Sequence, residues 1–204
     1  MLTTFDYKNG HYDRFERDFY GFKKVIVKTH DTQKRDEEYV VVEQTFNNDN
    51  FYEKGLQLAE VMQDGQGNKY LEKENQYSVT DRLAGTVLSS DAKKNFVNSA
   101  FPSLKETVQK FYEGQTDPGK TTPSSYGYDQ LGNVINFTDF GDEGDQDDIS
   151  STITYHSVED KYIMSSPKSI VVSGSNGTYR KRESSINEKG SVSQMKQFLQ
   201  NGEA

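Results

Sequence analysis

The side chains that could do chemistry in this chain are an acidic run, three histidines and one close pair of carboxylates. The acidic run, residues 142–148, is dense enough in carboxylates to suggest Ca²⁺, which takes six or more oxygen ligands. However, it lacks the regular alternation and the distal bidentate glutamate of an EF-hand loop. A solvated hairpin loop is therefore the favoured interpretation, and calcium binding remains the alternative.

The three histidines are scattered along the chain. His11, His30 and His156 do not share the spacing of a zinc site or of an HExxH motif, so they are interpreted as surface or strand-end residues. The chain also has no cysteine and no G-x-S-x-G elbow. We therefore expect no metal site, no cofactor and no enzymatic activity.

The carboxylate pair Glu16 and Asp18 could be imagined as an acid and a base. Arg14 and Arg17 are interleaved with them, which favours a ladder of ion pairs between strands. The aromatic residues around this pair, from Tyr12 to Phe22, could stack on sugar rings, although packing between strands is the preferred interpretation.

The composition favours a sheet over a dense globule. Hydrophobic residues make up only 32% of the 204 residues, yet aromatic residues make up 12%, which argues against disorder. Tyrosine and phenylalanine suit a pleated surface with one face packed and one face solvated. The net charge of -8 disfavours nucleic-acid binding, and no apolar stretch approaches the roughly 18 residues of a membrane span.

A repeated turn pattern indicates how the sheet is built. An Asp or Asn is followed three residues later by a Gly and then by a small polar residue. The Asp or Asn can bond to backbone amides ahead of it, and the Gly can take the left-handed conformation that closes a hairpin. Together with an Asn-Gly pair near the N-terminus, this pattern predicts turns at Asn9, Gly10, Asp64, Gly67, Asp129, Gly132, Asn187 and Gly190.

Between these turns lie strand-like segments, and together they predict an all-β fold of consecutive antiparallel hairpins. The most evident segments are 4–8, 24–29, 39–46, 56–62, 68–77, 134–140, 152–156, 170–173 and 178–186.

Residues 97–113 are ambiguous. Val97, Phe101, Leu104 and Val108 recur at helical spacing, and Ser103 with Glu106 resembles a helix capping box, so local signals alone predict a helix over 104–113.

Several boxes resemble, in the same order, those of the bacterial Rhs/YD-repeat toxin family. The chain is most similar to the B component of insecticidal toxin complexes and to SpvB-related proteins. The first box includes Tyr12, Asp13, Glu16, Arg17, Phe19, Gly21 and Phe22. The later boxes are Thr45–Leu56, the YD repeat Tyr128–Val134, Ser166–Val172 and Gln194–Leu199.

The resemblance implies a non-catalytic segment of a secreted virulence protein. In that family, successive hairpins form a hollow β-shell around a toxic polypeptide. The resemblance also implies a strand over Leu104–Tyr112 that pairs with Thr121–Tyr128. Because tertiary context overrides propensity, this strand is preferred to the helix, and one short helix near 97–113 is the alternative. Residues 1–204 are then expected to be one hairpin-repeat segment of a larger protein, with 1–90 and 120–204 as candidate sub-units joined by 91–119. The expected partners are other segments of the parent chain and other toxin-complex subunits. The alternative is a cell-surface β-domain that binds carbohydrate or a host protein.

A segment of such a shell would have strand edges that lack their neighbours. Exposed edges recruit other chains, so we also expect an isolated fragment to pair through its terminal strands, near 4–8 and 192–199.

Overall fold

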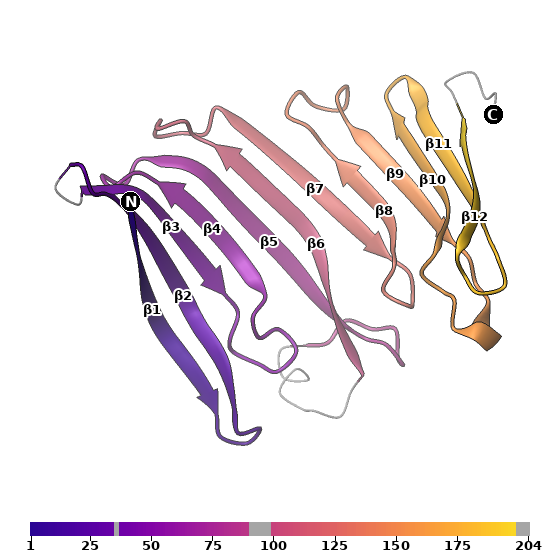
Figure 1. Cartoon of the computed structure of the whole chain (residues 1–204), viewed down its shortest axis with the longest axis horizontal. Coiled ribbons are helices and arrows are strands. Elements are labelled where there is room, and N and C mark those ends of the chain that lie inside the picture. The colour runs from indigo at the N-terminus through magenta and orange to yellow at the C-terminus, as the bar shows by residue number, and fades with distance from the viewer. Residues whose placement is uncertain (35–36, 90–98, 199–204) are drawn as a thin grey trace. The chain divides into compact units, whose positions relative to one another are not determined.

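The computed structural model describes residues 1–34, 37–89 and 99–198, and these residues are almost entirely β-strand (Figure 1). Within these ranges the sole helical element is the short 3₁₀ turn η2 (Glu159–Lys161). The strands are β1 (Leu2–Asp13), β2 (Asp18–Asp31), β3 (Glu37–Phe46), β4 (Gln57–Gln63), β5 (Lys69–Asp81), β6 (Ala100–Phe111), β7 (Lys120–Tyr128), β8 (Val134–Asp139), β9 (Ile149–Tyr155), β10 (Pro167–Gly174), β11 (Gly177–Ile186) and β12 (Val192–Phe198).

The chain divides into two compact units, Met1–Thr121 and Thr122–Ala204. In the first unit, β1 to β6 pair antiparallel in the order of the sequence. In the second, β7 to β12 do the same. Within each unit every strand thus turns back on the one before it, and the all-β prediction of consecutive hairpins is confirmed.

The strand β6 settles the ambiguity over residues 97–113. Residues 100–111 are extended and pair with β5, where Leu104 lies opposite Tyr77. The hydroxyl of Ser103 donates to the carbonyl of Ser78 at 3.0 Å instead of capping a helix. The helix alternative is wrong because β5 offers a full ladder of backbone partners, which outweighs the local helical spacing. Residues 97 and 98 lie outside the described ranges.

The prediction of a turn at Asn9 and Gly10 is also wrong, because both residues lie inside β1. The hairpin closes later, where Asp13 Oδ1 accepts from the amides of Phe15 at 2.9 Å and Glu16 at 2.7 Å. Gly10 instead provides room for aromatic rings, since a Cβ there would lie 3.1 Å from the Phe22 ring. The longer hairpin gains this packing and additional strand pairing.

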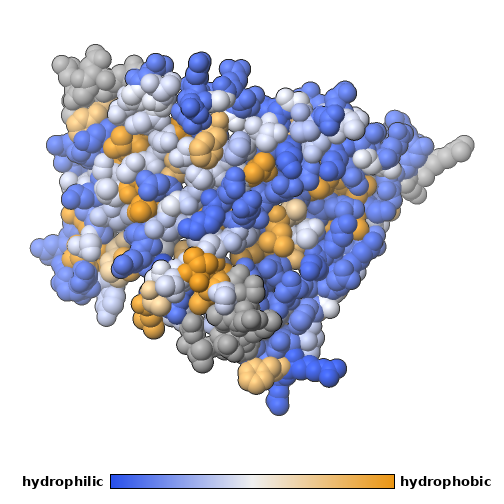
Figure 2. Space-filling view, turned by 180° about the vertical axis from the view of Figure 1, so that it is seen from behind, coloured by the Kyte–Doolittle hydropathy of each residue, from blue (hydrophilic) through white to orange (hydrophobic). Residues whose placement is uncertain are grey.

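The core is thin and lies in the first unit. Among the described residues, the buried hydrophobic side chains are Tyr20, Ile26, Val41, Val79, Leu88 and Tyr112. Val79 is fully buried, and the Leu88 amide donates to its carbonyl at 2.8 Å, which folds residues 82–89 back against β5. The other hydrophobic side chains of the described residues are half-buried or exposed. On the face shown in Figure 2, apolar side chains lie among hydrophilic ones.

Candidate functional site

Three hairpin turns share one hydrogen-bonding pattern. In the Asp129 turn, Oδ1 accepts from the amides of Leu131 at 2.8 Å and Asn133 at 2.9 Å, and Gly132 has a φ of +88°. The amide of Gly132 donates to the Asp129 carbonyl, and the amide of Asp129 donates to the Asn133 carbonyl. Corresponding bonds form in the turns of Asp64 with Gly67 and Asn187 with Gly190.

The Asp129 turn is tied to a distant part of its unit. The side-chain nitrogen of Asn133 donates to Asp129 Oδ2 at 2.8 Å and to the Met164 carbonyl at 2.9 Å. The hydroxyl of Tyr155 donates to the Val134 carbonyl at 2.7 Å. Burial would raise the pKa of Asp129, but the hydrogen bonds from Asn133 and the turn amides outweigh burial and lower it. These bonds therefore link the β7–β8 hairpin to β9 and to the segment before β10.

The box Tyr12–Phe22 forms the closed end of the β1–β2 hairpin. The rings of Tyr7 and Phe22 lie 4.9 Å apart, and those of Phe19 and Phe22 lie 5.2 Å apart in an edge-on arrangement. Tyr12 is exposed, whereas Tyr20 is buried with His11 stacked on it at 5.5 Å. The side chains of the box thus pack mainly on one another and on β1.

The prediction of a ladder of ion pairs at this hairpin is wrong. Glu16 and Arg17 lie in the turn, where Arg17 has a φ of +55°, so they are not opposite each other on paired strands. Asp18 Oδ2 instead accepts from Lys54 Nζ at 2.5 Å, which lowers the pKa of Asp18. The same ammonium lies 4.9 Å from the Tyr20 ring centroid. The box is therefore fastened by a lysine from a loop far along the chain.

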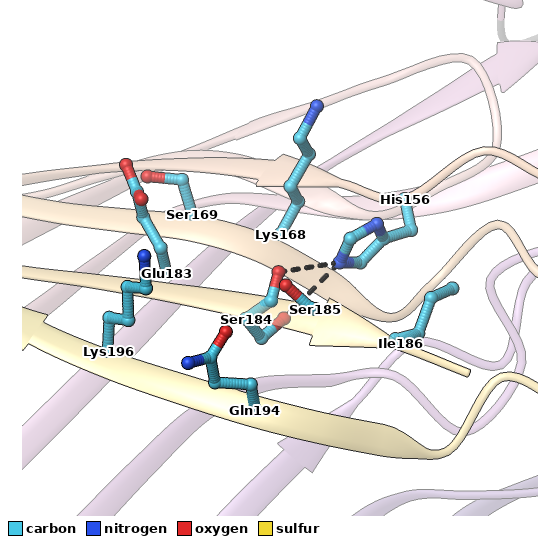
Figure 3. A pocket seen from close by; sticks show the side chains of 9 residues that line it. All are labelled: His156, Lys168, Ser169, Glu183, Ser184, Ser185, Ile186, Gln194 and Lys196. Atoms are coloured by element: carbon cyan, nitrogen blue, oxygen red, sulfur yellow. Dashed lines mark hydrogen bonds between the residues drawn. The ribbon is translucent and has the colours of Figure 1, made fainter.

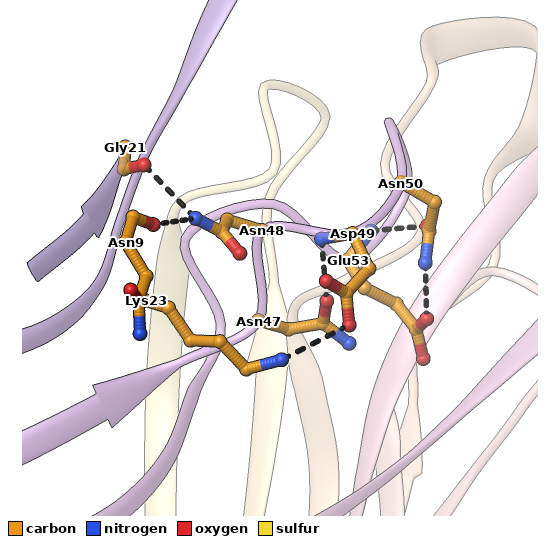
Figure 4. A network of polar contacts seen from close by, with 8 residues as sticks. All are labelled: Asn9, Gly21, Lys23, Asn47, Asn48, Asp49, Asn50 and Glu53. Carbon is orange, nitrogen blue, oxygen red and sulfur yellow. Dashed lines mark hydrogen bonds and ion pairs between the residues drawn. The ribbon is translucent and has the colours of Figure 1, made fainter. Parts of the chain in front are cut away.

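That loop, residues 47–56, carries a network of polar contacts (Figure 4). Asn48 is 3% exposed, and its side-chain nitrogen donates to the carbonyls of Asn9 at 2.9 Å and Gly21 at 3.0 Å. Asn9 and Gly21 have φ of +55° and +93°. Asn48 therefore satisfies two strand carbonyls at the place where both strands depart from regular geometry.

The rest of the loop is held by its own side chains. Asn50 Oδ1 accepts from the amides of Tyr52 at 3.1 Å and Glu53 at 3.0 Å, while Asn50 Nδ2 donates to Glu53 Oε2 at 2.6 Å. Lys23 Nζ lies 3.5 Å from Asp49 Oδ2. This network places Asn48 and Lys54 against the hairpin. The turn and box patterns did not single out these two residues, although both lie in the stretch that resembles the family.

The second unit has a hollow of about 410 Å³ over β10 to β12, lined by His156, Lys168, Ser169, Glu183, Ser184, Ser185, Ile186, Gln194 and Lys196 (Figure 3). His156 Nε2 lies 3.0 Å from the Ser184 carbonyl and 3.3 Å from its hydroxyl. A nitrogen that faces a carbonyl must carry the proton, and the Ser184 hydroxyl donates to the Pro167 carbonyl. This arrangement does not provide a nucleophile with its base.

One carboxylate of the acidic loop, that of Asp147, accepts hydrogen bonds within the loop. Asp147 Oδ2 accepts from the amide of Asp142 at 2.8 Å, and both oxygens of Asp147 lie 3.3 Å from the amide of Glu143. Burial, followed by repulsion from Asp145 and Asp147, raises the pKa of Asp148. Within the described part of the chain, no group of three or more His, Asp and Glu side chains could hold a metal ion.

Each of the three histidines has its own local surroundings in the structure. His11 stacks on Tyr20, His30 Nε2 lies 3.0 Å from Thr4 Oγ1, and His156 borders the hollow. In residues 1–34, 37–89 and 99–198, no helix is long and apolar enough to cross a membrane.

Comparison with known proteins confirms the resemblance to the B component of insecticidal toxin complexes. Residues 1–54 match the family model for the insecticide toxin TcdB middle/N-terminal region. These residues include the aromatic box and most of the loop that fastens it. No curated protein sequence matches the chain.

Three solved structures contain the same fold. The crystal structure of TcdB2-TccC3-Cdc42 matches 98% of this chain with a TM-score of 0.72 at 11% identity. That of TcdB2-TccC3-TEV matches 98% with a TM-score of 0.69 at 11% identity, and the Photorhabdus luminescens Tc holotoxin pore matches 91% with 0.65 at 11%. The match covers 15%, 15% and 14% of those chains, so this chain spans a small part of their length.

Proposed function

We propose that this chain is a non-catalytic segment of the wall of an encapsulating β-shell, within a secreted Rhs/YD-repeat protein that delivers a toxin. The observation that carries the proposal is the superposition of 98% of the chain on 15% of a TcdB2-TccC3-Cdc42 chain, together with the family match of residues 1–54. Its partners are the remaining segments of its parent protein and the other subunits of the toxin complex.

The architecture supports a role as a wall. Within each unit every strand pairs with the next, so each sheet can be extended by further hairpins without any change of topology. The bonds of Asn48 and Asn133 tie hairpins to segments distant in sequence, which stiffens a sheet that has only a thin core. Stiffness without a reactive group is what a container wall requires.

The polar clusters support the absence of catalysis. Asp129, Asp147 and Asn48 direct their polar atoms at backbone groups of the same unit, so these atoms are already used in holding the fold. An active site needs polar groups that remain available to a substrate.

The native gene product provides the test. An antibody against this chain would be used to isolate the protein from its source, and mass spectrometry would give the size of the polypeptide and of whatever accompanies it. We expect a chain several times larger than 23.3 kDa and an accompanying polypeptide that resists protease until the complex is denatured. A species of 23.3 kDa with no protected polypeptide would contradict the proposal.

A second candidate is a surface domain that binds carbohydrate. The half-exposed rings of Phe5, Tyr7 and Phe19 favour it, because exposed aromatic faces can stack on sugars. The same isolated protein would be applied to a glycan array. Binding that is lost in Tyr7→Ala, together with the absence of a protected polypeptide, would support this candidate over the shell.

A further inference from the structure

One face of the first unit carries a continuous line of apolar side chains across six strands. In antiparallel sheets, residues directly opposite each other point to the same face. The registers link Phe5 to Val27, Val27 to Val42, Val42 to Met62, Met62 to Leu71, and Leu71 to Phe111. We call these six residues the apolar row, and five inter-strand spacings make it about 24 Å wide.

Much of the apolar row is open to solvent. Phe5 is 54% exposed and Met62 is 36% exposed, and the other four members are half-buried. An apolar surface that crosses a whole sheet is stabilised when something covers it, since burial of apolar area is favourable by about 25 cal/mol per Å².

The opposite face of the same strands is different. There the registers place lysines and glutamates, which pair with one another: Lys24 with Glu43 at 2.5 Å, Lys28 with Glu38 at 2.5 Å, Lys69 with Glu72 at 2.9 Å and Lys110 with Glu74 at 3.1 Å. Stems of long charged side chains cover apolar surface while their heads remain in water, and Ile26 and Val41 on this face are indeed buried. The apolar side chains of this face are therefore already covered, whereas those of the apolar row are not.

We propose that the apolar row is a self-association surface on which a second copy of this chain packs face to face. A two-fold axis parallel to the strands reverses the order of the row in the second copy. Phe5 then faces Phe111 of the second copy, Val27 faces Leu71, and Val42 faces Met62. A small branched side chain opposes a larger one at two of these three contacts, which is the alternation that lets two sheets interdigitate.

The charges beside the apolar row permit this packing. The neighbouring row on the same face runs through Tyr7, Val25, Gln44, Glu60, Lys73 and Gln109. Its two charged members, Glu60 and Lys73, have opposite signs, although the whole chain carries a net charge of -8. The reversal sets Glu60 against Gln44 and Lys73 against Val25 of the second copy, so like charges do not oppose each other.

Sedimentation velocity of the 204-residue chain, from micromolar to millimolar concentration, tests the inference. Wild type is expected to dimerise as concentration rises. Met62→Lys is expected to weaken the dimer by about tenfold or more, because the symmetric interface would bury two new charges. Gln63→Lys is the matched control, since it adds the same charge one residue away on the opposite face, and its dimer is expected to match wild type.

Each other outcome overturns the inference. A monomer at all concentrations would show that the proposed interface does not form. A dimer that persists in Met62→Lys would point to pairing through the β1 or β12 edge. Equal weakening by both lysine variants indicates a general charge effect. Far-UV circular dichroism establishes that the variants are folded. If Met62→Lys is unfolded, Phe5→Ser replaces it, since Phe5 lies half-exposed in the terminal strand of the unit. The inference concerns the isolated chain and does not rest on the shell.

Discussion

The side-chain nitrogen of Asn48 lies 3.0 Å from the carbonyl oxygen of Gly21, across 27 residues of sequence. The same nitrogen donates to Asn9, so one buried amide holds two strands at the end of the first hairpin. Asn9, Gly21, Asn48 and Lys54 all lie inside residues 1–54, the region that matches the family model. The contact thus gives a physical reason for the box and the loop to occur together.

Asn48→Asp should destabilise the first unit by about 2 kcal/mol or more. The substitution keeps the size of the side chain, but it replaces the donor with a carboxylate that faces two carbonyl oxygens, and unsatisfied buried polar groups cost about 1–3 kcal/mol, more when charged. Urea denaturation followed by circular dichroism measures the effect. The exposed turn residue Asn176→Asp is the control, and equal midpoints for the two variants would mean that Asn48 does not hold the hairpin.

Gly132→Ala should destabilise the second unit by about 1 kcal/mol, because Gly132 has a φ of +88° that alanine adopts only with strain. Gly119→Ala is the matched control, since its Cβ would enter open space and its φ is not in the left-handed region. Denaturation midpoints decide between them. If Gly132→Ala is as stable as wild type, the turn does not depend on glycine.

Tyr112 should make stability fall at high pH. Its hydroxyl donates to Glu72 Oε2 at 2.7 Å, and this bond, together with burial, raises the pKa of Tyr112 from 10.0 to about 12. Because the folded-state pKa is the higher one, the contribution is fully present below pH 10 and is lost as pH rises from 10 towards 12. Tyr112→Phe should therefore show a shallower loss of stability across this range.

Tyr162→Phe is the control for that measurement, because Tyr162 is 87% exposed. Melting temperatures would be recorded at intervals of pH for wild type and both variants. Parallel curves for wild type and Tyr112→Phe would show that the bond to Glu72 does not couple folding to proton release.

Calcium should leave the melting temperature almost unchanged. The oxygens of Asp147 already accept backbone amides, and only a ligand that prefers the folded state stabilises it, so we expect a shift below about 1 °C in millimolar Ca²⁺. Differential scanning calorimetry gives the answer. A rise of several degrees that disappears in Asp145→Asn would restore the calcium interpretation of residues 142–148.

The fold class could be predicted because its causes are local. The Val-rich segments 24–29 and 39–46 alternate as strands do, and the turn pattern recurs between such segments. The local spacing of residues 104–113 predicted a helix, whereas the backbone ladder offered by β5 makes these residues a strand. The failure at Asn9 has the same origin, since Asn-Gly predicts a turn by itself, whereas the structure uses Asn9 to receive a bond from Asn48, 39 residues away.

The candidate site was harder to predict than the fold. Asn48 bonds to residues that are 27 and 39 positions away, and Lys54 bonds to a residue 36 positions away. Neither residue type signals such a role by itself. The apolar row has the same character. Phe5, Met62 and Phe111 come from different hairpins, and they form a line only when the registers of six strands are known.

A cryo-electron microscopy map of the native parent protein tests the central claim most directly. If this chain is a segment of a shell wall, the strands β1 to β12 will be continuous with strands from neighbouring segments, and one face of the sheet will line an internal cavity. A map in which the chain stands alone as a projecting domain, with solvent on both faces and no enclosed space, would contradict the account.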